Sequence, residues 1–305
     1  MKLNIWLILD GKRGHEKQIE DLAFCINKKI ISNIKKIKKI SLLKIIFNFL
    51  GIGVDPCRYF SRPDLIIAAG HKTHLDALQK KLKYGGKVIL IMKPSIPSFL
   101  FDLTIIPFHD KIFWGKNILK IFGSVNKIEN KRKQLKNKAI IMVGGPSKNF
   151  LWNSSEIILS IKKIIEKNPK LIFTLGTSRR TPENFLTDIQ INYKFCNKLE
   201  IVDHRHVSPQ WLETEIPKYE YSWVTQDSIS MMNELISAGS KVTCISMQSV
   251  NTKFDKMYQD LYEKKIINFN NKKTQKIIFK ESQISTAVFC ANFIIKKFFK
   301  NYCER

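Results

Sequence analysis

The sequence predicts an α/β protein with two domains, each built on a parallel sheet. Strand-like apolar runs alternate with amphipathic helical stretches along nearly the whole chain, as in folds whose parallel strands are joined by crossover helices. With 305 residues the chain exceeds the usual size of one domain. A polar, lysine-rich stretch at 126–138 interrupts the alternation, which then restarts. We therefore expect one domain at 1–130, a second at 131–280, and a C-terminal helical segment at 281–305 that can pack back across them.

Apolar runs bounded by polar or glycine-containing stretches predict the strands of both halves. In the first half these runs fall at Asn4–Leu9, Asp64–Ala69, Lys87–Met92 and Leu103–Ile106. In the second half they fall at Ala139–Val143, Leu171–Leu175, Tyr219–Val224 and Lys241–Ser246.

Apolar side chains at helical spacing predict the helices between these strands. The expected helices are Glu16–Lys28, Lys72–Lys83, Asn153–Lys167, Ile229–Ser237 and Thr286–Lys300. Asn153 and Glu156 are spaced as a variant of the capping box at the start of one of them. The segment 34–53 mixes lysine pairs with a dense apolar run, and it leaves two interpretations. It is either a strand and a core helix with solvated lysines, or a segment that rests on an anionic membrane surface.

The composition argues against several classes of protein. The net charge is +26, but the basic residues are mostly lysines spread along a chain that is also rich in isoleucine and asparagine, so we expect no specific nucleic-acid partner. The six cysteines form no CxxC pair, which argues against a disulfide framework or a zinc ribbon. No apolar run is long enough to cross a membrane. We expect a cytoplasmic protein, with peripheral attachment at the inner face of the membrane as a second option.

Glycine, hydroxyl and basic residues gather where the predicted strands end. Ligands of parallel α/β sheets bind outside the carboxyl ends of the strands, where helix N-termini offer free N–H groups. Among only eight arginines, Arg13, Arg179 and Arg180 fall at such strand ends, where a planar guanidinium suits an anion with several oxygens. The segments of this kind are 10–18, 68–74, 143–150, 174–182 and 224–239.

Six motifs, in unchanged order between residues 7 and 239, carry a resemblance to a known family. They read LILDGKRGHEKQ, AAGHKTH, MKPS…FDLTIIPFHD, IMVGGPSKNFLW, TSRRTP and VTQDSISMMNELISAG. Together they resemble the mitochondrial-fission (elongated-mitochondria) family, whose bacterial members look like glycosyltransferases of the GT-B type. The resemblance implies two Rossmann-like domains with parallel sheets that face each other across a cleft. The first domain would bind an acceptor, and the second a nucleotide-sugar donor.

The resemblance implies a donor site in the second half. There Glu234 would hold the ribose hydroxyls, while Asp227 with Ser228 would cap the helix whose amides face the diphosphate. At least one of Arg179 and Arg180 would bind a phosphate, and the other would pair with a surface acid. The alternatives without a ligand are an ordinary helix start at each of these places and a tight turn at the paired glycines. The full expected donor set is Gly144, Gly145, Ser147, Thr177, Ser178, Arg179, Arg180, Thr181, Asp227, Ser228, Ser230 and Glu234.

By the same resemblance, the first half would supply the acceptor site and a general base. His15 is the expected base, because a histidine titrates near neutral pH, and Asp10 would orient it or serve in its place. The alternative is that His15 is only a polar residue at a helix start. Two further histidines, His71 and His74, would contact the acceptor or cap a helix. The expected acceptor set is Gly11, Lys12, Arg13, Gly14, Gly70, His71 and His74.

Absent motifs narrow the expected chemistry further. The sequence contains no DxD, HExxH, GxSxG or Walker motif, so we expect no metal and no cofactor apart from a nucleotide sugar as co-substrate. The activity implied by the resemblance is therefore metal-independent transfer of a sugar from a nucleotide sugar to a glycan or lipid-linked acceptor. The alternative is a non-catalytic adaptor of the mitochondrial-fission type, which keeps the fold and recruits protein partners.

Overall fold

The structure is a computed structural model that divides into two compact units. The first unit comprises Met1–Lys127 and Ser285–Arg305, and the second comprises Ile128–Ile284. The C-terminal segment therefore belongs to the first unit. The residues that the structure describes are 2–41, 43–45, 55–108, 110, 115, 117–129, 134–193, 197–208, 210–250, 252–277 and 285–302.

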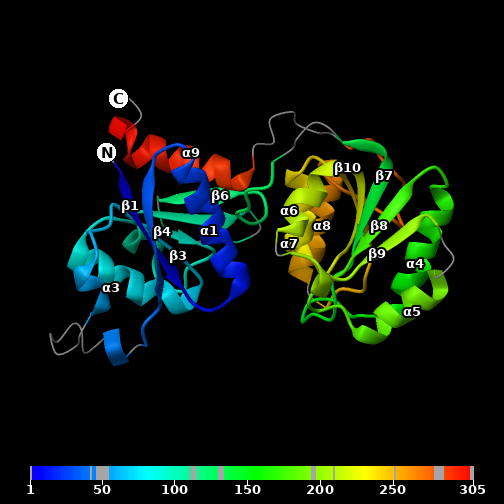
Figure 1. Ribbon diagram of the computed structural model, residues 1–305, viewed down its shortest axis with the longest axis horizontal. Helices are drawn as coiled ribbons and strands as arrows, with labels where there is room; N and C mark the ends of the chain where they lie inside the picture. Colours follow the sequence, from blue (N-terminus) through cyan, green and yellow to red (C-terminus); the bar gives the residue numbers. More distant parts are fainter. Residues whose placement is uncertain are drawn as a thin grey trace. The chain divides into compact units, whose positions relative to one another are not determined.

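The first unit is built on a six-stranded sheet with the strand order β2-β1-β3-β4-β5-β6 (Figure 1). All of its neighbouring strands are parallel. The strands are β1 (Leu3–Leu9), β2 (Ser32–Lys38), β3 (Leu65–Ala69), β4 (Lys87–Ile91), β5 (Leu103–Pro107) and β6 (Ile118–Ile121). The helices are α1 (Arg13–Asn27), α3 (His74–Tyr84) and α9 (Thr286–Phe298), with the short 3-10 turns η1 (Pro56–Tyr59), η2 (His71–Thr73), η3 (Ser98–Leu100) and η6 (Lys300–Tyr302).

Two apolar layers sandwich this sheet, because alternate residues of each strand point to opposite faces. On one face Leu3, Ile5 and Leu7 pack with α1 and α9. On the other face Trp6 and Ile8 pack with Ala77 of α3 and with Phe101. The terminal helix thus completes one wall of the first unit's core, next to α1 (Figure 1).

The second unit repeats the plan with the strand order β12-β11-β10-β7-β8-β9, again with parallel neighbours. Helices α4 and α5 pack on one face of this sheet, where Ile157, Ile161 and Phe185 meet Ala139 and Ile141 of β7. The strands are β7 (Leu135–Met142), β8 (Ile172–Gly176), β9 (Leu199–Val202), β10 (Tyr219–Thr225), β11 (Lys241–Ile245) and β12 (Asn268–Phe269). The helices are α4 (Ser154–Lys167), α5 (Glu183–Tyr193), α6 (Trp211–Glu215), α7 (Ile229–Ser237) and α8 (Thr252–Glu263), with the 3-10 turns η4 (His204–His206) and η5 (Ile216–Lys218).

Every predicted strand and helix is present, with ends that shift by a few residues. The predicted capping of α4 is confirmed in part, because the Asn153 side chain accepts a hydrogen bond from the Glu156 amide. The lysine-rich stretch 126–138 is a connection only in part, since β7 begins inside it at Leu135. The segment 34–53 supplies most of strand β2, while residues 46–53 lie outside the described residues, so neither interpretation of that segment is tested there.

Candidate functional site

In each sheet there is one strand on either side of which the connections run in opposite directions along the sheet. Ligands of open α/β sheets bind at this point of the strand order. In the first unit, β1 is followed by its neighbour β2, and the chain then returns to β3 on the other side of β1. In the second unit, β7 lies between β8 and β10 in the same way. The loops after β1 and β3, and those after β7 and β10, therefore flank the expected binding crevices. These four loops contain most of the predicted site residues.

Asp10 and His15 form a hydrogen-bonded pair at the crevice of the first unit. His15 Nδ1 lies 2.8 Å from Asp10 Oδ2, and the Asp10 side chain is 1% exposed, against 17% for His15. The pair forms because α1 begins directly after the β1 loop, which puts His15 in its first turn. The Lys12 amide donates to the other carboxylate oxygen of Asp10, at 3.0 Å.

The surroundings of Asp10 hold its carboxyl group in the ionised form. Burial by itself raises the pKa of Asp10, but the Lys12 amide hydrogen bond and the bond and charge of His15 outweigh it, so the pKa falls below its usual 3.8. An ionised carboxylate can only accept a hydrogen bond, so Nδ1 of His15 is the donor in this pair. This bond leaves Nε2 as the ring nitrogen that could take a proton from a substrate.

Gly70 packs against this pair from the end of β3. Its φ of +83° lies in the region that favours glycine, and a Cβ at this position would come within 2.5 Å of His15 Nδ1 and 3.2 Å of Asp10 Oδ2. A side chain at residue 70 would therefore displace the imidazole. Gly70 therefore contributes to the predicted cluster because its missing side chain leaves room for the His15 ring.

The other predicted acceptor residues divide into exposed and buried ones. The β1 loop is exposed from Gly11 to Gly14, and His71 is exposed as well. The expectation for His74 needs correction, because its side chain is buried and its ring packs edge-on against Phe101, with centroids 5.6 Å apart. Burial, together with the charge of His71, lowers the pKa of His74 to about 4, so it is a neutral histidine of the interior.

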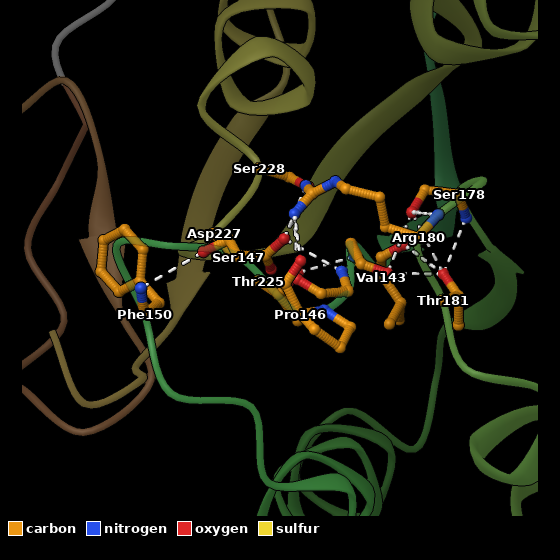
Figure 2. Close-up of polar contacts among 12 residues, drawn as sticks. Val143, Pro146, Ser147, Phe150, Ser178, Arg180, Thr181, Thr225, Asp227 and Ser228 are labelled. Atoms are coloured by element: carbon orange, nitrogen blue, oxygen red, sulfur yellow. Dashed lines mark hydrogen bonds and ion pairs between the residues drawn. The ribbon is translucent and has the colours of Figure 1, made fainter. Parts of the chain in front are cut away.

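Arg180 is the centre of the corresponding cluster in the second unit. Figure 2 shows its guanidinium reaching from the β8 loop to the loops after β7 and β10. Nη1 donates to the carbonyls of Gly145 and Pro146, at 3.0 and 3.2 Å. Nη2 donates to Asp227 Oδ2 at 2.7 Å and to Ser228 Oγ at 3.0 Å. Of the two arginines, Arg180 is therefore the one paired with an acid, and that acid has a fully buried side chain.

The paired glycines allow these loops to approach one another closely. A Cβ on Gly144 would lie 2.1 Å from Asp227 Oδ2, and one on Gly145 would lie 1.9 Å from the Arg180 carbonyl oxygen. Their amides donate to Thr225 Oγ1 at 2.8 Å and to Asp227 Oδ2 at 2.9 Å. The groups that approach these glycines closely are therefore protein groups, and the two amides already donate to protein acceptors.

The hydroxyls of the TSRRT motif also bond within the protein. Ser178 Oγ and Thr181 Oγ1 lie 2.9 and 2.5 Å from the Gly144 carbonyl oxygen, to which they donate (Figure 2). Thr177 is buried, and its Oγ1 accepts from the His204 amide at 3.0 Å. Ser147 Oγ accepts from the amides of Asn149 and Phe150. These side chains hold the strand-end loops in place.

The start of α7 differs from the expectation. Neither Asp227 nor Ser228 caps this helix, because the Ser228 side chain makes no capping bond and the Asp227 carboxylate faces Gly145 and Arg180. The first amides of α7 consequently have no side-chain acceptor of the kind that a cap supplies. Ser230, in the first turn of this helix, is exposed, and so is Arg179 in the β8 loop, for which the described residues show no hydrogen bond or ion pair. Glu234 lies further along α7 and is 6% exposed.

Two features are absent from the described residues. No group of three or more His, Cys, Asp or Glu side chains in this part of the chain is arranged to hold a metal ion. No described helix has the length and apolar character needed to cross a membrane.

Comparisons with known proteins agree with this architecture. The family model described as Mitochondrial fission ELM1 matches residues 13–298. Uncharacterized protein RP120 of Rickettsia prowazekii is 26% identical over 327 residues, which cover 88% of this chain and 91% of that protein.

Solved structures show the same fold at low sequence identity. UDP-GlcNAc 2-epimerase from Methanocaldococcus jannaschii is 12% identical, with a TM-score of 0.60 over 97% of this chain and 100% of that one. Another structure of that epimerase holds UDP-GlcNAc and UDP. MurG of Acinetobacter baumannii is 10% identical, with a TM-score of 0.50 over 100% of this chain and 95% of that one. The predicted fold class of two Rossmann-like units of the GT-B type is confirmed.

Proposed function

The chain belongs to the mitochondrial fission ELM1 family, and from that premise we propose that it is a glycosyltransferase using a nucleotide-sugar donor. The fold is that of enzymes that act on nucleotide sugars, which supports the donor class. The observation that carries the proposal is the Asp10–His15 pair at the crevice of the first unit, with Gly70 against it. A protein that used this fold only to recruit partners would not need an oriented base there.

In the proposed reaction, His15 acts on a hydroxyl group of the acceptor. Nε2 takes the hydroxyl proton while the oxygen attacks the anomeric carbon of the donor, and the bond from that carbon to the diphosphate oxygen breaks. The buried Asp10 carboxylate stabilises the imidazolium that forms, because it accepts the hydrogen bond from Nδ1–H throughout the step while the proton stays on Nδ1. The acceptor would be a glycan or a lipid-linked glycan.

The second unit would bind the donor and neutralise the leaving nucleoside diphosphate. In this proposal the phosphates bind to the amides at the start of α7, which have no side-chain cap, and to the exposed side chains of Ser230 and Arg179. Arg180 and Asp227 act on the phosphates indirectly in this proposal, because they hold the loops after β7 and β10 together. Glu234 is proposed to hold the ribose. No metal is required for this arrangement of donors.

One observation favours the alternative of a non-catalytic adaptor. Most of the hydroxyls that were expected to face the donor bond to protein groups instead, and Arg180 is the arginine that pairs with an acid, so only Arg179 is left to bind a phosphate. A family member that kept the fold without the reaction would retain these bonds, since they stabilise the loops.

A binding panel separates the two functions. Thermal unfolding of the protein would be followed with UDP, GDP, ADP and CMP and with the matching nucleotide sugars. A ligand at 100 times its Kd adds about 2.7 kcal/mol to the unfolding free energy, so stabilisation by one nucleotide supports the transferase. No stabilisation by any member of the panel supports the adaptor.

Variants then assign the roles within the transferase. With the identified donor, His15→Gln should lower turnover by two to four orders of magnitude and leave nucleotide affinity unchanged, as expected for a lost general base. Glu234→Gln should weaken nucleotide affinity. His206→Gln, at an exposed histidine of the second unit that lies outside the predicted sites, is the matched control. Unchanged turnover in His15→Gln would refute the assignment of the base.

A further inference from the structure

The outward side of α9 exposes apolar side chains that pack on no core. Phe289 and Phe293 are 46% and 36% exposed, and their spacing of four residues puts them on one side of the helix. The opposite side is buried against the first unit through Ala287, Cys290, Ala291, Ile294 and Ile295. The two phenylalanines are therefore held at the surface by a helix that the core fixes in place.

Lysines continue the same surface toward the end of the chain. Lys296, Lys297 and Lys300 are exposed, and residues 285–302 contain no Asp or Glu. Lys297 Nζ lies 5.8 Å from the ring centre of Phe293 and 5.4 Å from that of Phe298. We define Phe289, Phe293, Lys296, Lys297 and Lys300 as the α9 surface.

A second exposed phenylalanine site lies near the start of α9. Phe24 is 43% exposed, with the ammonium groups of Lys28 and Lys127 at 5.0 and 4.9 Å from its ring centre. Lys127 follows Asn126, whose amide and carbonyl bond to the first residues of α9. Lys127 also pairs with the buried carboxylate of Asp21, at 3.7 Å. Lysine beside exposed phenylalanine thus recurs at both ends of the helix.

The surface is also hollowed where the lysines and aromatic rings meet. A pocket of about 700 Å³ lies at the C-terminal end of α9, lined by Phe293, Phe298, Phe299 and Tyr302 together with Lys296, Lys297, Lys300 and Asn301. Aromatic rings and ammonium groups therefore share one concave region. Lys87, which also approaches Phe298, is partly neutralised by Asp102 at 3.5 Å.

We propose that the α9 surface docks on an anionic phospholipid membrane. Exposed phenylalanine side chains favour the boundary between headgroups and acyl chains, while lysine stems can lie along that boundary with their ammonium groups at the lipid phosphates. The charge of the surface is complementary to that of an anionic leaflet. A nucleic acid or an acidic protein would use the lysines but would leave Phe289 and Phe293 in water. The proposal does not rest on the proposed transferase.

The test is co-sedimentation of the full chain with vesicles. Binding is expected to vesicles of 30% phosphatidylglycerol in phosphatidylcholine, to be weaker with phosphatidylcholine alone, and to decrease in high salt. The variant Lys296→Gln/Lys297→Gln/Lys300→Gln should lose about fivefold in partitioning per lysine, or about a hundredfold in all. Phe289→Ser/Phe293→Ser should lose at least tenfold, because the apolar contact is removed.

Matched controls distinguish this surface from the general basic charge of the protein. Lys162→Gln/Lys163→Gln/Lys170→Gln removes three exposed lysines from the second unit, and Phe99→Ser/Phe108→Ser removes phenylalanines that are 66% and 63% exposed. Both controls should bind vesicles like the original chain. Equal losses in the control lysine variant, or unchanged binding in Phe289→Ser/Phe293→Ser, would overturn the proposal. Binding to a short DNA duplex with no binding to anionic vesicles would overturn it too.

Discussion

Replacing Arg180 by alanine should destabilise the second unit locally. The substitution removes four hydrogen bonds and leaves the Asp227 carboxylate, whose side chain is fully buried, without its cation. Unpairing a fully buried charge costs about 3–5 kcal/mol. Because the Arg180 side chain is 42% exposed, water can reach part of the vacated space, and we expect a smaller loss of about 2 kcal/mol. That loss corresponds to a fall in Tm of about 4–8 °C for a unit of this size.

Matched variants and a local measurement make this prediction specific. Arg179→Ala removes the neighbouring, exposed guanidinium and should change stability by less than about 0.5 kcal/mol. Adding Asp227→Asn to Arg180→Ala removes the unpaired charge and should restore about 1 kcal/mol. Amide hydrogen exchange should rise at Gly144 and Gly145 in Arg180→Ala, because their acceptors lie on the loop that Arg180 holds. Identical unfolding and exchange in the Arg179→Ala and Arg180→Ala variants would refute the reasoning.

Two further predictions concern the first unit. Gly70→Ala should lower turnover more strongly than it lowers the free energy of unfolding, because the new Cβ would meet His15. Gly85→Ala is the control: Gly85 has nearly the same positive φ (+82°), but a Cβ there would have no atom within 4 Å. Equal effects of the two glycine variants on turnover would contradict a role for the space at Gly70. His74 should make stability depend on pH: its folded pKa of about 4 lies below the usual 6.5, so protons bind preferentially to the unfolded chain and stability falls as the pH drops from 6.5 toward 4. Urea unfolding of His74→Phe should show less of this fall, and an unchanged pH profile would place its origin elsewhere.

The strands that the sequence analysis predicted are those with continuous apolar runs, since both of their faces are buried. Strand β2 was expected only as part of one of the two interpretations of the segment 34–53, because it is an edge strand with the sequence SNIKKIK and mostly exposed residues. β12 was missed because it has only two residues, which is too short to produce a pattern. Helix α8 has a clear apolar side, formed by Met257, Tyr258 and Leu261, and this helical spacing is a signal in the sequence that predicts it.

The loops rich in glycine and hydroxyl residues lie together as predicted, whereas the contacts of single residues in them differ from the prediction. The loops lie together because parallel strands place their carboxyl ends at one edge of the sheet. Which of two adjacent arginines turns toward Asp227 depends on the course of a loop in three dimensions, and local sequence does not contain that information. The same holds for His74, whose spacing from His71 suggested a shared surface although only His71 is exposed.

The position of α9 has a consequence for the order in which the chain can fold during synthesis. A ribosome releases the second unit in full before residues 285–302 emerge, whereas the first unit lacks the helix that covers part of its apolar interior until those residues have emerged. The first unit is therefore begun before the second unit and completed after it. Until then, the side of α1 and of the sheet that α9 will cover is open to water, to chaperones and to contact with other nascent chains.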